Sequence, residues 1–353
     1  MLKNDIEEIV NKLENIEQYR NKNFLITGGT GFLGSLIVRT LFLLNKKYNL
    51  NLKIIFYIRS KEKLENLFKE ELKNINYDTI IGNLNSEIKY EYKIDYIFHC
   101  ANTTNSLEMI EKPVETISSI FEGTKYILEL AKEKKIESMV YLSSMEVYGQ
   151  VMTDSLTTEK ELGYIDILNT RSSYSEGKRA AECLCKCYSS EYDIPIKIAR
   201  LAQIFGPGIS KNDNRVFAQF MRSALKKEDI VLHTTGESKG NYCYTVDCIR
   251  ALFLLLNKGE NGEAYNIVNE ETNISIKEMA HLVANEIFPY KVNVRIEIPK
   301  ENKGYAPITK LKLSGQKLRK LNWQPETNLK KMYLNLAKYI FEREQNNDLY
   351  SIR

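Results

Sequence analysis

Residues 171–182 contain a tyrosine and a lysine, Tyr174 and Lys178, whose spacing suits joint proton chemistry. Four residues make about one turn of a helix, so both side chains project from the same helix face. An ammonium beside a phenol favours the phenolate, and we therefore expect Lys178 to lower the pKa of Tyr174. A phenol that ionises near neutral pH is a usable acid or base for interconverting an alcohol and a carbonyl. The chain has 22 tyrosines, so this pattern gains weight only from the features around it.

A glycine-rich turn near the start of the chain has the spacing of a dinucleotide site. An apolar run at 23–27 leads into Gly28, Gly31 and Gly34, and helical spacing of apolar residues follows to residue 41. Gly28 permits the turn, Gly31 lets a pyrophosphate approach the backbone, and Gly34 lets helix and strand pack closely. The helix start then offers N–H groups and a positive dipole end to phosphates. The stretch predicts a bound dinucleotide.

The next apolar run, residues 52–58, ends at Arg59 and not at an acid. In NAD-specific folds an acid near this point binds the ribose hydroxyls, whereas arginine accommodates a 2′-phosphate. Lys61 and Lys63 follow Arg59 closely. The sequence therefore favours NADP over NAD, and the alternative is a surface arginine with loose cofactor choice.

Strand and helix patterns alternate along the first half of the chain. Apolar runs at 78–81, 95–102 and 138–144 alternate with helical periodicity such as that of 114–134. This alternation predicts an α/β fold with a doubly wound, Rossmann-like parallel sheet. Ser144 ends one of these strands, and ligands of such sheets bind beyond the carboxyl ends of the strands.

The alternation weakens beyond about residue 170. Short strands near 231–233, 241–245 and 264–268 and helices at 276–287 and 329–341 predict a smaller C-terminal α/β substrate lobe. We expect an N-terminal helix in residues 1–20, a mainly dinucleotide-binding domain in 21–200, and a mainly substrate-binding lobe in 201–345 that interleaves with it.

Composition narrows the class of protein further. The 353 residues carry 50 Lys and Arg against 46 acidic residues, and the net charge of +4 does not indicate a nucleic-acid partner. The apolar stretches are too short or too charged to span a bilayer, and no secretory signal opens the chain. The cysteines at 183, 185 and 187 lack the spacing of a zinc site, so we predict no metal. These features predict reduced cysteines in a cytoplasmic protein with no membrane partner.

Taken together, these motifs resemble the NAD-dependent epimerase/dehydratase family of the extended short-chain dehydrogenase/reductase superfamily, which acts on nucleotide sugars. Within it the stretch 171–179 is most similar to UDP-glucuronate decarboxylases. The resemblance covers nearly the whole chain and is carried by residues 27–34, 142–149, 174–178, 199–208, 244–247 and 321–325. It implies a homodimer, formed through the helices near 113–134 and 172–190, and a place in polysaccharide synthesis.

The resemblance also implies roles for individual residues. Tyr174 would be the acid/base, Lys178 would hold the nicotinamide ribose, and Ser144 would bond the reacting sugar oxygen. Glu146 fits the decarboxylases and the 4,6-dehydratases and completes the implied catalytic set. The implied cofactor residues are Gly28, Gly31, Phe32, Leu33, Gly34, Arg59, Asn83, Leu84, Ala101 and Lys178. The implied substrate residues are Gln203 and Arg215, the latter with a plain surface role as its alternative.

Several positions depart from the family pattern, most of them on the substrate side. Met145 stands where dehydratases have the acid that protonates the leaving water, which disfavours dehydration. Gly240 replaces an arginine, and the late arginine expected near 302–307 is missing. Amides or an apolar residue replace the usual acid or asparagine at Asn83, Ile120 and Gln203. These departures predict an unusual substrate.

Three functions stay open at this point. If the hydride returns to the sugar, the enzyme is an epimerase or a decarboxylase acting through a keto intermediate. If it does not, the enzyme is a net NADPH-dependent reductase of an activated keto-sugar or open-chain sugar. The third possibility, a non-catalytic dinucleotide sensor, is disfavoured because Tyr174 and Lys178 are both present.

Overall fold

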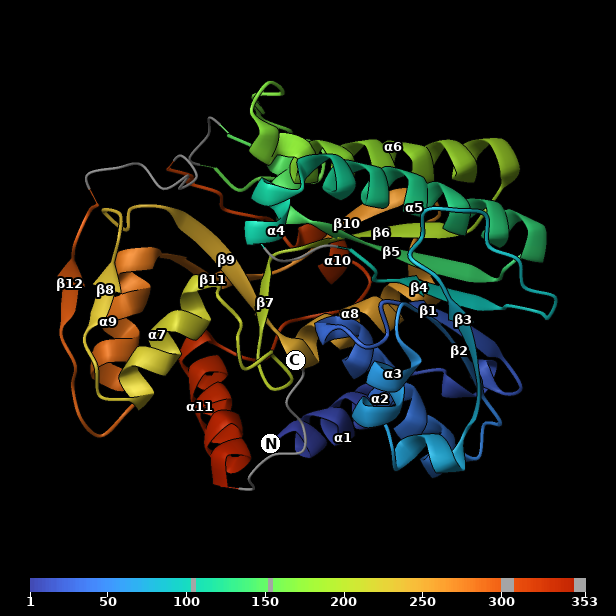
Figure 1. Cartoon of the computed structure of the whole chain (residues 1–353), viewed down its shortest axis with the longest axis horizontal. Coiled ribbons are helices and arrows are strands. Elements are labelled where there is room, and N and C mark those ends of the chain that lie inside the picture. The colour runs from blue at the N-terminus through green and yellow to red at the C-terminus, as the bar shows by residue number, and fades with distance from the viewer. Residues whose placement is uncertain (103–105, 152–154, 300–307, 346–353) are drawn as a thin grey trace.

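A seven-stranded parallel sheet forms the centre of the molecule (Figure 1). This computed structural model describes residues 1–102, 106–151, 155–299 and 308–345. The strands of the sheet are β1 (Asn23–Thr27), β2 (Lys53–Ile58), β3 (Asn76–Ile81), β4 (Tyr96–His99), β5 (Ser138–Ser144), β6 (Ile196–Leu201) and β10 (Glu263–Ile267). Their order is β10-β6-β5-β4-β1-β2-β3, and each neighbouring pair runs parallel. The predicted doubly wound sheet is confirmed.

Helices cover both faces of this sheet. α5 (Pro113–Lys134) and α6 (Ser173–Tyr192) lie side by side on one face, and α2 (Phe32–Tyr48), α3 (Lys61–Leu67) and α8 (Thr245–Lys258) lie on the other (Figure 1). Successive strand residues point to opposite faces. Phe24 and Ile26 therefore pack with the α2 side, whereas Leu25 packs with the α5 and α6 side. Both faces of the strands are buried, as the continuous apolar runs require.

The sheet is completed by chain from beyond residue 200. β10 pairs with β6 at the edge of the sheet, and α8 packs against β5 and β6. The prediction that placed the strand at 264–268 in the smaller lobe is therefore wrong. Its short apolar run did not show which sheet it would join, because edge pairing depends on tertiary contacts.

The smaller lobe is built from two short sheets and three helices. One sheet contains β7 (Gln203–Phe205), β9 (Lys239–Tyr244) and β11 (Asn269–Ser275), and the other contains β8 (Ile230–Leu232) and β12 (Val294–Ile296). The helices are α7 (Val216–Leu225), α9 (Ile276–Glu286) and α11 (Leu329–Gln345). α9 begins with a capping box in which Ser275 and Glu278 exchange hydrogen bonds with each other's backbone N–H.

The N-terminal helix α1 (Leu2–Lys12) is packed against α2 and α8. Ile6, Ile9 and Val10 belong to the main core, so the helix braces the sheet. Its buried Asp5 accepts a 2.6 Å hydrogen bond at Oδ2 from the Tyr244 hydroxyl. Tyr244 Oη in turn accepts a 3.0 Å bond from the Asn335 amide of α11. These bonds tie α1 to the C-terminal part of the chain.

The remaining elements are short. They are η1 (Ile16–Tyr19), η2 (Glu71–Asn74), α4 (Ser106–Glu111), η3 (Met145–Tyr148), η4 (Thr170–Ser172) and α10 (Gln316–Arg319). Among the helices that the structure describes, none has the length and apolar character needed to cross a membrane.

Candidate active site

The glycine turn after β1 leaves no room for side chains. Gly28 has a φ of +65°, and a Cβ there would lie 2.9 Å from the Ala101 backbone. A Cβ on Gly34 would lie 2.2 Å from the carbonyl oxygen of Gly28. Gly31 donates its N–H to that same oxygen at 2.9 Å and then caps the start of α2 without a side-chain bond. Phe32 and Leu33 open the helix directly after it. The surface offered at the helix start is therefore backbone, as a pyrophosphate requires.

The loop after β4 is fastened to the end of β1 by one hydroxyl. Thr27 Oγ1 accepts the N–H groups of Cys100 and Ala101, each at 3.0 Å, and lies 2.7 Å from His99 Nδ1. Because the oxygen already accepts two bonds, its own proton goes to His99. Burial lowers the pKa of His99 to about 3, so the ring stays neutral and accepts that proton at Nδ1. Ala101 is thus fixed against Gly28.

Sequence reasoning gave no role to Thr27 or His99. The two residues face each other in the register of β1 and β4, which only the strand order reveals. The neighbouring Asn102 has a buried side-chain oxygen with no hydrogen-bond partner among the described residues. A backbone-lined turn at a helix start and an unpartnered amide oxygen at the same sheet edge fit a dinucleotide cofactor.

The structure brings together Ser144, Tyr174 and Lys178. Ser144 ends β5, accepts the Glu146 N–H at 3.2 Å and hydrogen-bonds to Tyr174 on α6. Lys178 lies one turn further along α6, where Nζ donates to the Leu142 carbonyl at 2.6 Å. The same Nζ lies 4.8 Å from the centre of the Tyr141 ring and 5.9 Å from that of Tyr174. The tyrosine and lysine therefore share one helix face, as predicted.

The prediction that Lys178 lowers the pKa of Tyr174 is wrong in its net direction. Burial raises the pKa of Tyr174, and the nearby Glu146 carboxylate raises it further. The Ser144 hydrogen bond and the Arg171 and Arg215 cations act in the opposite direction without reversing the shift. The phenol is therefore protonated at neutral pH in this structure. Burial also lowers the pKa of Lys178, to about 7.

Glu146 is held by an arginine to which sequence reasoning gave no role. Arg171 places two guanidinium nitrogens 3.1 and 3.2 Å from the Glu146 carboxylate oxygens. Ser175 donates a further bond of 3.3 Å to the same carboxylate. Arg171 and Ser175 flank Tyr174 in the chain, and the positive charge of Arg171 partly offsets the effect of the Glu146 carboxylate on the phenol. The available signal was the spacing of Arg171, three residues before Tyr174.

The predicted adenosine end of the cofactor site lies along β2 and β3. Arg59 is exposed directly after β2, and Ser60 then caps α3 by accepting the Lys63 N–H at 3.1 Å. Leu84 is buried with a φ of +61°, and its N–H donates to the Tyr57 hydroxyl at 3.1 Å. Asn83 beside it is exposed. These residues thus lie just after the ends of the neighbouring strands β2 and β3. The glycine turn follows β1 at the same edge of the sheet.

The two predicted substrate residues differ in how they are held. Gln203 lies in β7, in register with Tyr242 of β9. Arg215 forms a tight ion pair with Asp213, 2.6 Å at its shortest, and donates to the Ile204 carbonyl at 3.2 Å. Its guanidinium also lies over the rings of Phe217 and of Phe32 at the start of α2.

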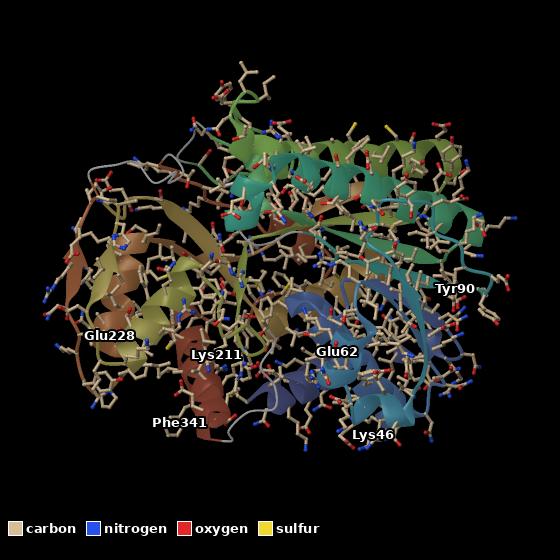
Figure 2. All side chains as sticks on the ribbon, in the orientation of Figure 1. Lys46, Glu62, Tyr90, Lys211, Glu228 and Phe341 are labelled. Carbon is tan, nitrogen blue, oxygen red and sulfur yellow. The ribbon has the colours of Figure 1, made fainter. Side chains whose placement is uncertain are left out.

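This loop therefore joins the two lobes, and Lys211 on the same loop lies where they meet (Figure 2). Arg215 is 31% exposed even though Asp213 pairs with it, so part of the guanidinium faces solvent. Arg215 therefore has a structural role at the junction of the two lobes, and part of its guanidinium stays accessible there.

The sequence model of one family matches residues 24–268. That model describes the NAD dependent epimerase/dehydratase family. The chain belongs to this family. Its fold is that of the extended short-chain dehydrogenases/reductases, and the resemblance inferred from the motifs is confirmed.

Relatives of the chain include UDP-glucuronic acid decarboxylases and a dTDP-D-glucose 4,6-dehydratase. UDP-glucuronic acid decarboxylase 6 of Arabidopsis thaliana is 29% identical over 88% of this chain and 86% of that protein. A dTDP-D-glucose 4,6-dehydratase of Dictyostelium discoideum is 29% identical over 75% of this chain. The aligned region spans 62% of that second protein, so the rest of its length has no counterpart in the match.

Solved structures of the family share the fold at low identity. The NAD complex of dTDP-glucose 4,6-dehydratase from Bacillus anthracis has a TM-score of 0.75 and 21% identity, and the match covers 92% of this chain and 98% of that one. UDP-glucose 4-epimerase from Thermotoga maritima, solved with UDP-glucose, has a TM-score of 0.73 and 22% identity, with 91% and 99% covered. At these identities the likeness establishes the architecture alone.

The residues that depart from the family pattern have packing roles or open surroundings. Met145 packs against the small core cluster around Tyr148, and Ile120 is buried between α5 and α6 beside Gly177. Among the described residues, no atom lies within 4 Å of where a Cβ on Gly240 would stand, so within that part of the chain the position is open. The departure at 302–307 lies outside the described residues.

Proposed function

We propose that this protein is an NAD(P)-dependent enzyme that acts on a nucleotide-activated sugar through a keto intermediate. The observation that carries the proposal is the contact between Tyr174 and Ser144 at the carboxyl end of β5, with Lys178 one turn below. This group lies at the sheet edge where the glycine turn of β1 also ends. Ligands of doubly wound sheets bind at that edge.

Each side chain has a distinct part in the proposed reaction. The nicotinamide, when bound, supplies the exchange of hydride with a sugar carbon. Tyr174 holds or releases the proton of the hydroxyl at that carbon, Ser144 hydrogen-bonds the same oxygen, and Lys178 holds the nicotinamide ribose. The raised pKa of Tyr174 keeps its proton in place. That protonated form donates to a keto oxygen, which suits the step that regenerates the alcohol.

Epimerisation or decarboxylation, in which the hydride returns to the sugar, is the outcome we favour. Glu146 lies beside Tyr174 as a carboxylate paired with Arg171, so it is available to act on an adjacent carbon. Met145 packs into a core cluster and has no proton to give, which argues against elimination of water. A net reductase remains the second candidate, since a protonated Tyr174 and an NADPH-type site serve it equally well.

We further propose that the cofactor is NADP. Lys63 has a lowered pKa, first because of partial burial and then because of the Arg59 charge beside it. Within the described part of the chain, no carboxylate forms an ion pair with Arg59. Two neighbouring cations without an acid are stabilised by an anion bound between them, and the 2′-phosphate of NADP is such an anion.

A homodimer through α5 and α6 is the assembly we propose. Val114, Ile117 and Phe121 lie three and four residues apart along α5, so they form one stripe. They are 70%, 38% and 37% exposed. An apolar stripe of this kind is stabilised when a second copy covers it. Light scattering of the wild type and of the Phe121→Glu variant tests this assembly, and two monomeric profiles would contradict it.

Mass analysis of reactions with NAD or NADP and a panel of nucleotide sugars tests the proposed chemistry. Loss of carbon dioxide identifies a decarboxylase, a gain of two hydrogens a reductase, and altered mobility at constant mass an epimerase. Tyr174→Phe should reduce turnover by about 10²–10⁴-fold while cofactor binding is preserved. Biological activity that stays unchanged in Tyr174→Phe would instead support a non-catalytic dinucleotide sensor.

A further inference from the structure

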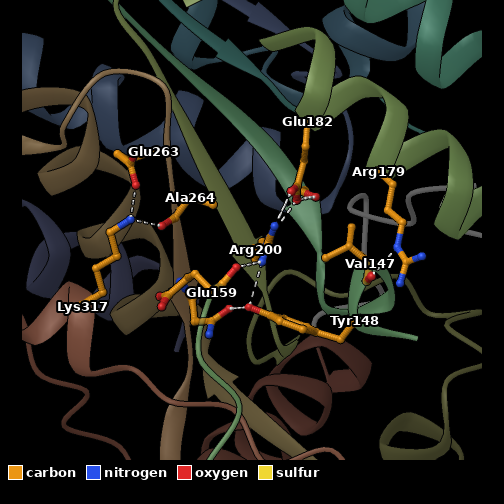
Figure 3. Close-up of polar contacts among 11 residues, drawn as sticks. Val147, Tyr148, Glu159, Arg179, Glu182, Arg200, Glu263, Ala264 and Lys317 are labelled. Atoms are coloured by element: carbon orange, nitrogen blue, oxygen red, sulfur yellow. Dashed lines mark hydrogen bonds and ion pairs between the residues drawn. The ribbon is translucent and has the colours of Figure 1, made fainter. Parts of the chain in front are cut away.

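The face of α6 that carries Tyr174 and Lys178 continues one turn further to a buried acid, Glu182. The three residues follow one another at intervals of four, so they share one side of the helix. Glu182 faces Arg200 of β6, and their side chains are 9% and 8% exposed. Figure 3 shows the Glu182 carboxylate and the Arg200 guanidinium pointing directly at each other.

Glu182 binds both strands beneath the helix. Arg200 Nε lies 3.1 Å from each carboxylate oxygen, and a terminal guanidinium nitrogen lies 2.7 Å from Oε2. The Ser143 hydroxyl of β5 donates to Oε1 at 2.5 Å. Ser143 directly precedes Ser144, so the carboxylate fixes α6 against the residue that hydrogen-bonds Tyr174.

The other end of Arg200 holds the segment that follows β5. One terminal nitrogen donates to the Tyr148 hydroxyl at 3.1 Å and to the Glu159 carbonyl at 2.8 Å (Figure 3). The Tyr148 hydroxyl donates onward to Asn266 of β10 at 2.6 Å. Since Tyr148 ends η3, which also contains Glu146, the ion pair connects both pieces of chain that form the site.

Glu182 also acts on Lys178 through its charge. Lys178 is fully buried and contacts a carbonyl and the Tyr141 ring, neither of which is an acid. Burial lowers the pKa of Lys178, and the strongest opposing influence is the Glu182 carboxylate. The other ionisable groups around the ammonium are Cys185 on α6, Cys100 and His99 at the end of β4, and the tyrosines at 141 and 174.

We propose that Glu182 is a positioning residue for the Tyr174–Lys178 pair: it fixes α6 against β5 through Ser143 and Arg200, and it places a buried carboxylate one helical turn from Lys178. The bearing of this on catalysis rests on the proposed function. The geometry of the Glu182 contacts and the charge of Lys178 do not depend on the proposed function, and both can be measured without substrate. The competing view is that the ion pair only braces the fold, as buried pairs often do.

The test measures the titration of Lys178 by NMR in protein labelled at lysine Cε, with the signal assigned by its loss in Lys178→Met. Glu182→Gln keeps the shape and the Ser143 bond but removes the charge. We expect the midpoint of the Lys178 titration to fall by on the order of one pH unit. Glu270→Gln is the matched control, since it removes the acid from another ion pair, 2.6 Å long, with Arg319. It should leave the Lys178 titration unchanged.

The double variant Glu182→Gln with Arg200→Met separates the effect on Lys178 from the cost of leaving a buried guanidinium unpaired. The single variant leaves Arg200 buried without its partner and therefore risks unfolding, whereas the double variant leaves no unpaired charge. We expect the double variant to be more thermally stable than Glu182→Gln alone and still to show the lowered Lys178 midpoint. A wild-type midpoint in the double variant, or no shift in either variant, would overturn the proposal. Failure of every nucleotide sugar to react would overturn only the proposed function, because the titration needs no substrate.

Discussion

The glycine turn after β1 and the loop before α7 meet at Phe32, yet they are held in different ways. The turn is fixed by backbone contacts, with no room at Gly28 or Gly34 for a single added carbon. The loop is fixed by side chains, chiefly the ion pair of Arg215 with Asp213. Few residue types fit a position that backbone contacts fix. An ion pair can be replaced by other contacting side chains, and an open position accepts many residue types. The half proposed to bind the cofactor can therefore be recognised from the sequence, and the half proposed to bind the substrate cannot.

Gly34→Ala tests most directly whether backbone contacts fix the glycine turn. Its Cβ would stand 2.2 Å from a carbonyl oxygen that cannot move without opening the turn. We expect a loss of stability above about 3 kcal/mol and a loss of dinucleotide affinity beyond about 100-fold. Thermal unfolding and fluorescence titration with NADH and NADPH measure both. Binding within twofold of the wild type would show that the turn is not a tight cradle.

The variant Asp5→Asn tests the contact that joins α1 to the C-terminal part of the chain. The quantity compared is the pH dependence of the free energy of unfolding. Burial raises the pKa of Asp5 to about 7, against the Tyr244 hydrogen bond, which lowers it. A carboxyl whose pKa is higher folded than unfolded stabilises the protein at low pH and loses that contribution as the pH rises through the folded pKa. The free energy of unfolding of the wild type relative to Asp5→Asn should therefore fall by about 2–3 kcal/mol between pH 5 and pH 8.

Urea unfolding of both proteins across this pH range provides the measurement. Taking the difference cancels the other titrating groups that the two proteins share. A difference that stays flat from pH 5 to pH 8 would mean that Asp5 is ionised in the fold and that α1 carries no pH-sensitive contact.

Asp213→Asn tests the loop before α7, which side-chain contacts hold in place. Although burial opposes it, Arg215 holds the pKa of Asp213 below its usual range, so the acid is ionised and its bonds to Arg215 are charge-assisted. Weakening them should cost about 1–2 kcal/mol of stability and raise KM for the nucleotide sugar several-fold. Cofactor affinity should stay within twofold. An equal loss of cofactor and sugar affinity would show that the two halves are not held independently.

Gly240→Ala should have the smallest effect. No atom of the residues that the structure describes lies within 4 Å of the added carbon, and Gly240 has no positive φ that would require glycine. Surface changes of this kind usually stay within about 0.5 kcal/mol. Thermal unfolding beside Gly34→Ala makes the comparison direct, and a marked loss at Gly240 would mean that the smaller lobe also depends on backbone fit.

Most of the elements around the proposed cofactor site were predictable because their signals are local. The strand at 138–144 and the helix at 114–134 agree with β5 and α5 to within one residue. The glycine turn and the Tyr174–Lys178 spacing likewise need only neighbouring residues to be interpreted. The pKa of Tyr174 was not predictable in this way, since its direction depends on how deeply the phenol is buried.

The parallel sheet, the glycine turn and the helix face shared by Tyr174 and Lys178 could be predicted from the sequence alone, because chain period and backbone sterics decide these features locally. The folded structure was needed to show that β10 completes the sheet, that Thr27 and His99 hold the loop at Ala101, and that Glu182 pairs with Arg200 near Lys178. These pairings join residues from separate strands and helices, and no local pattern encodes which strands become neighbours or how far a charge is withdrawn from water.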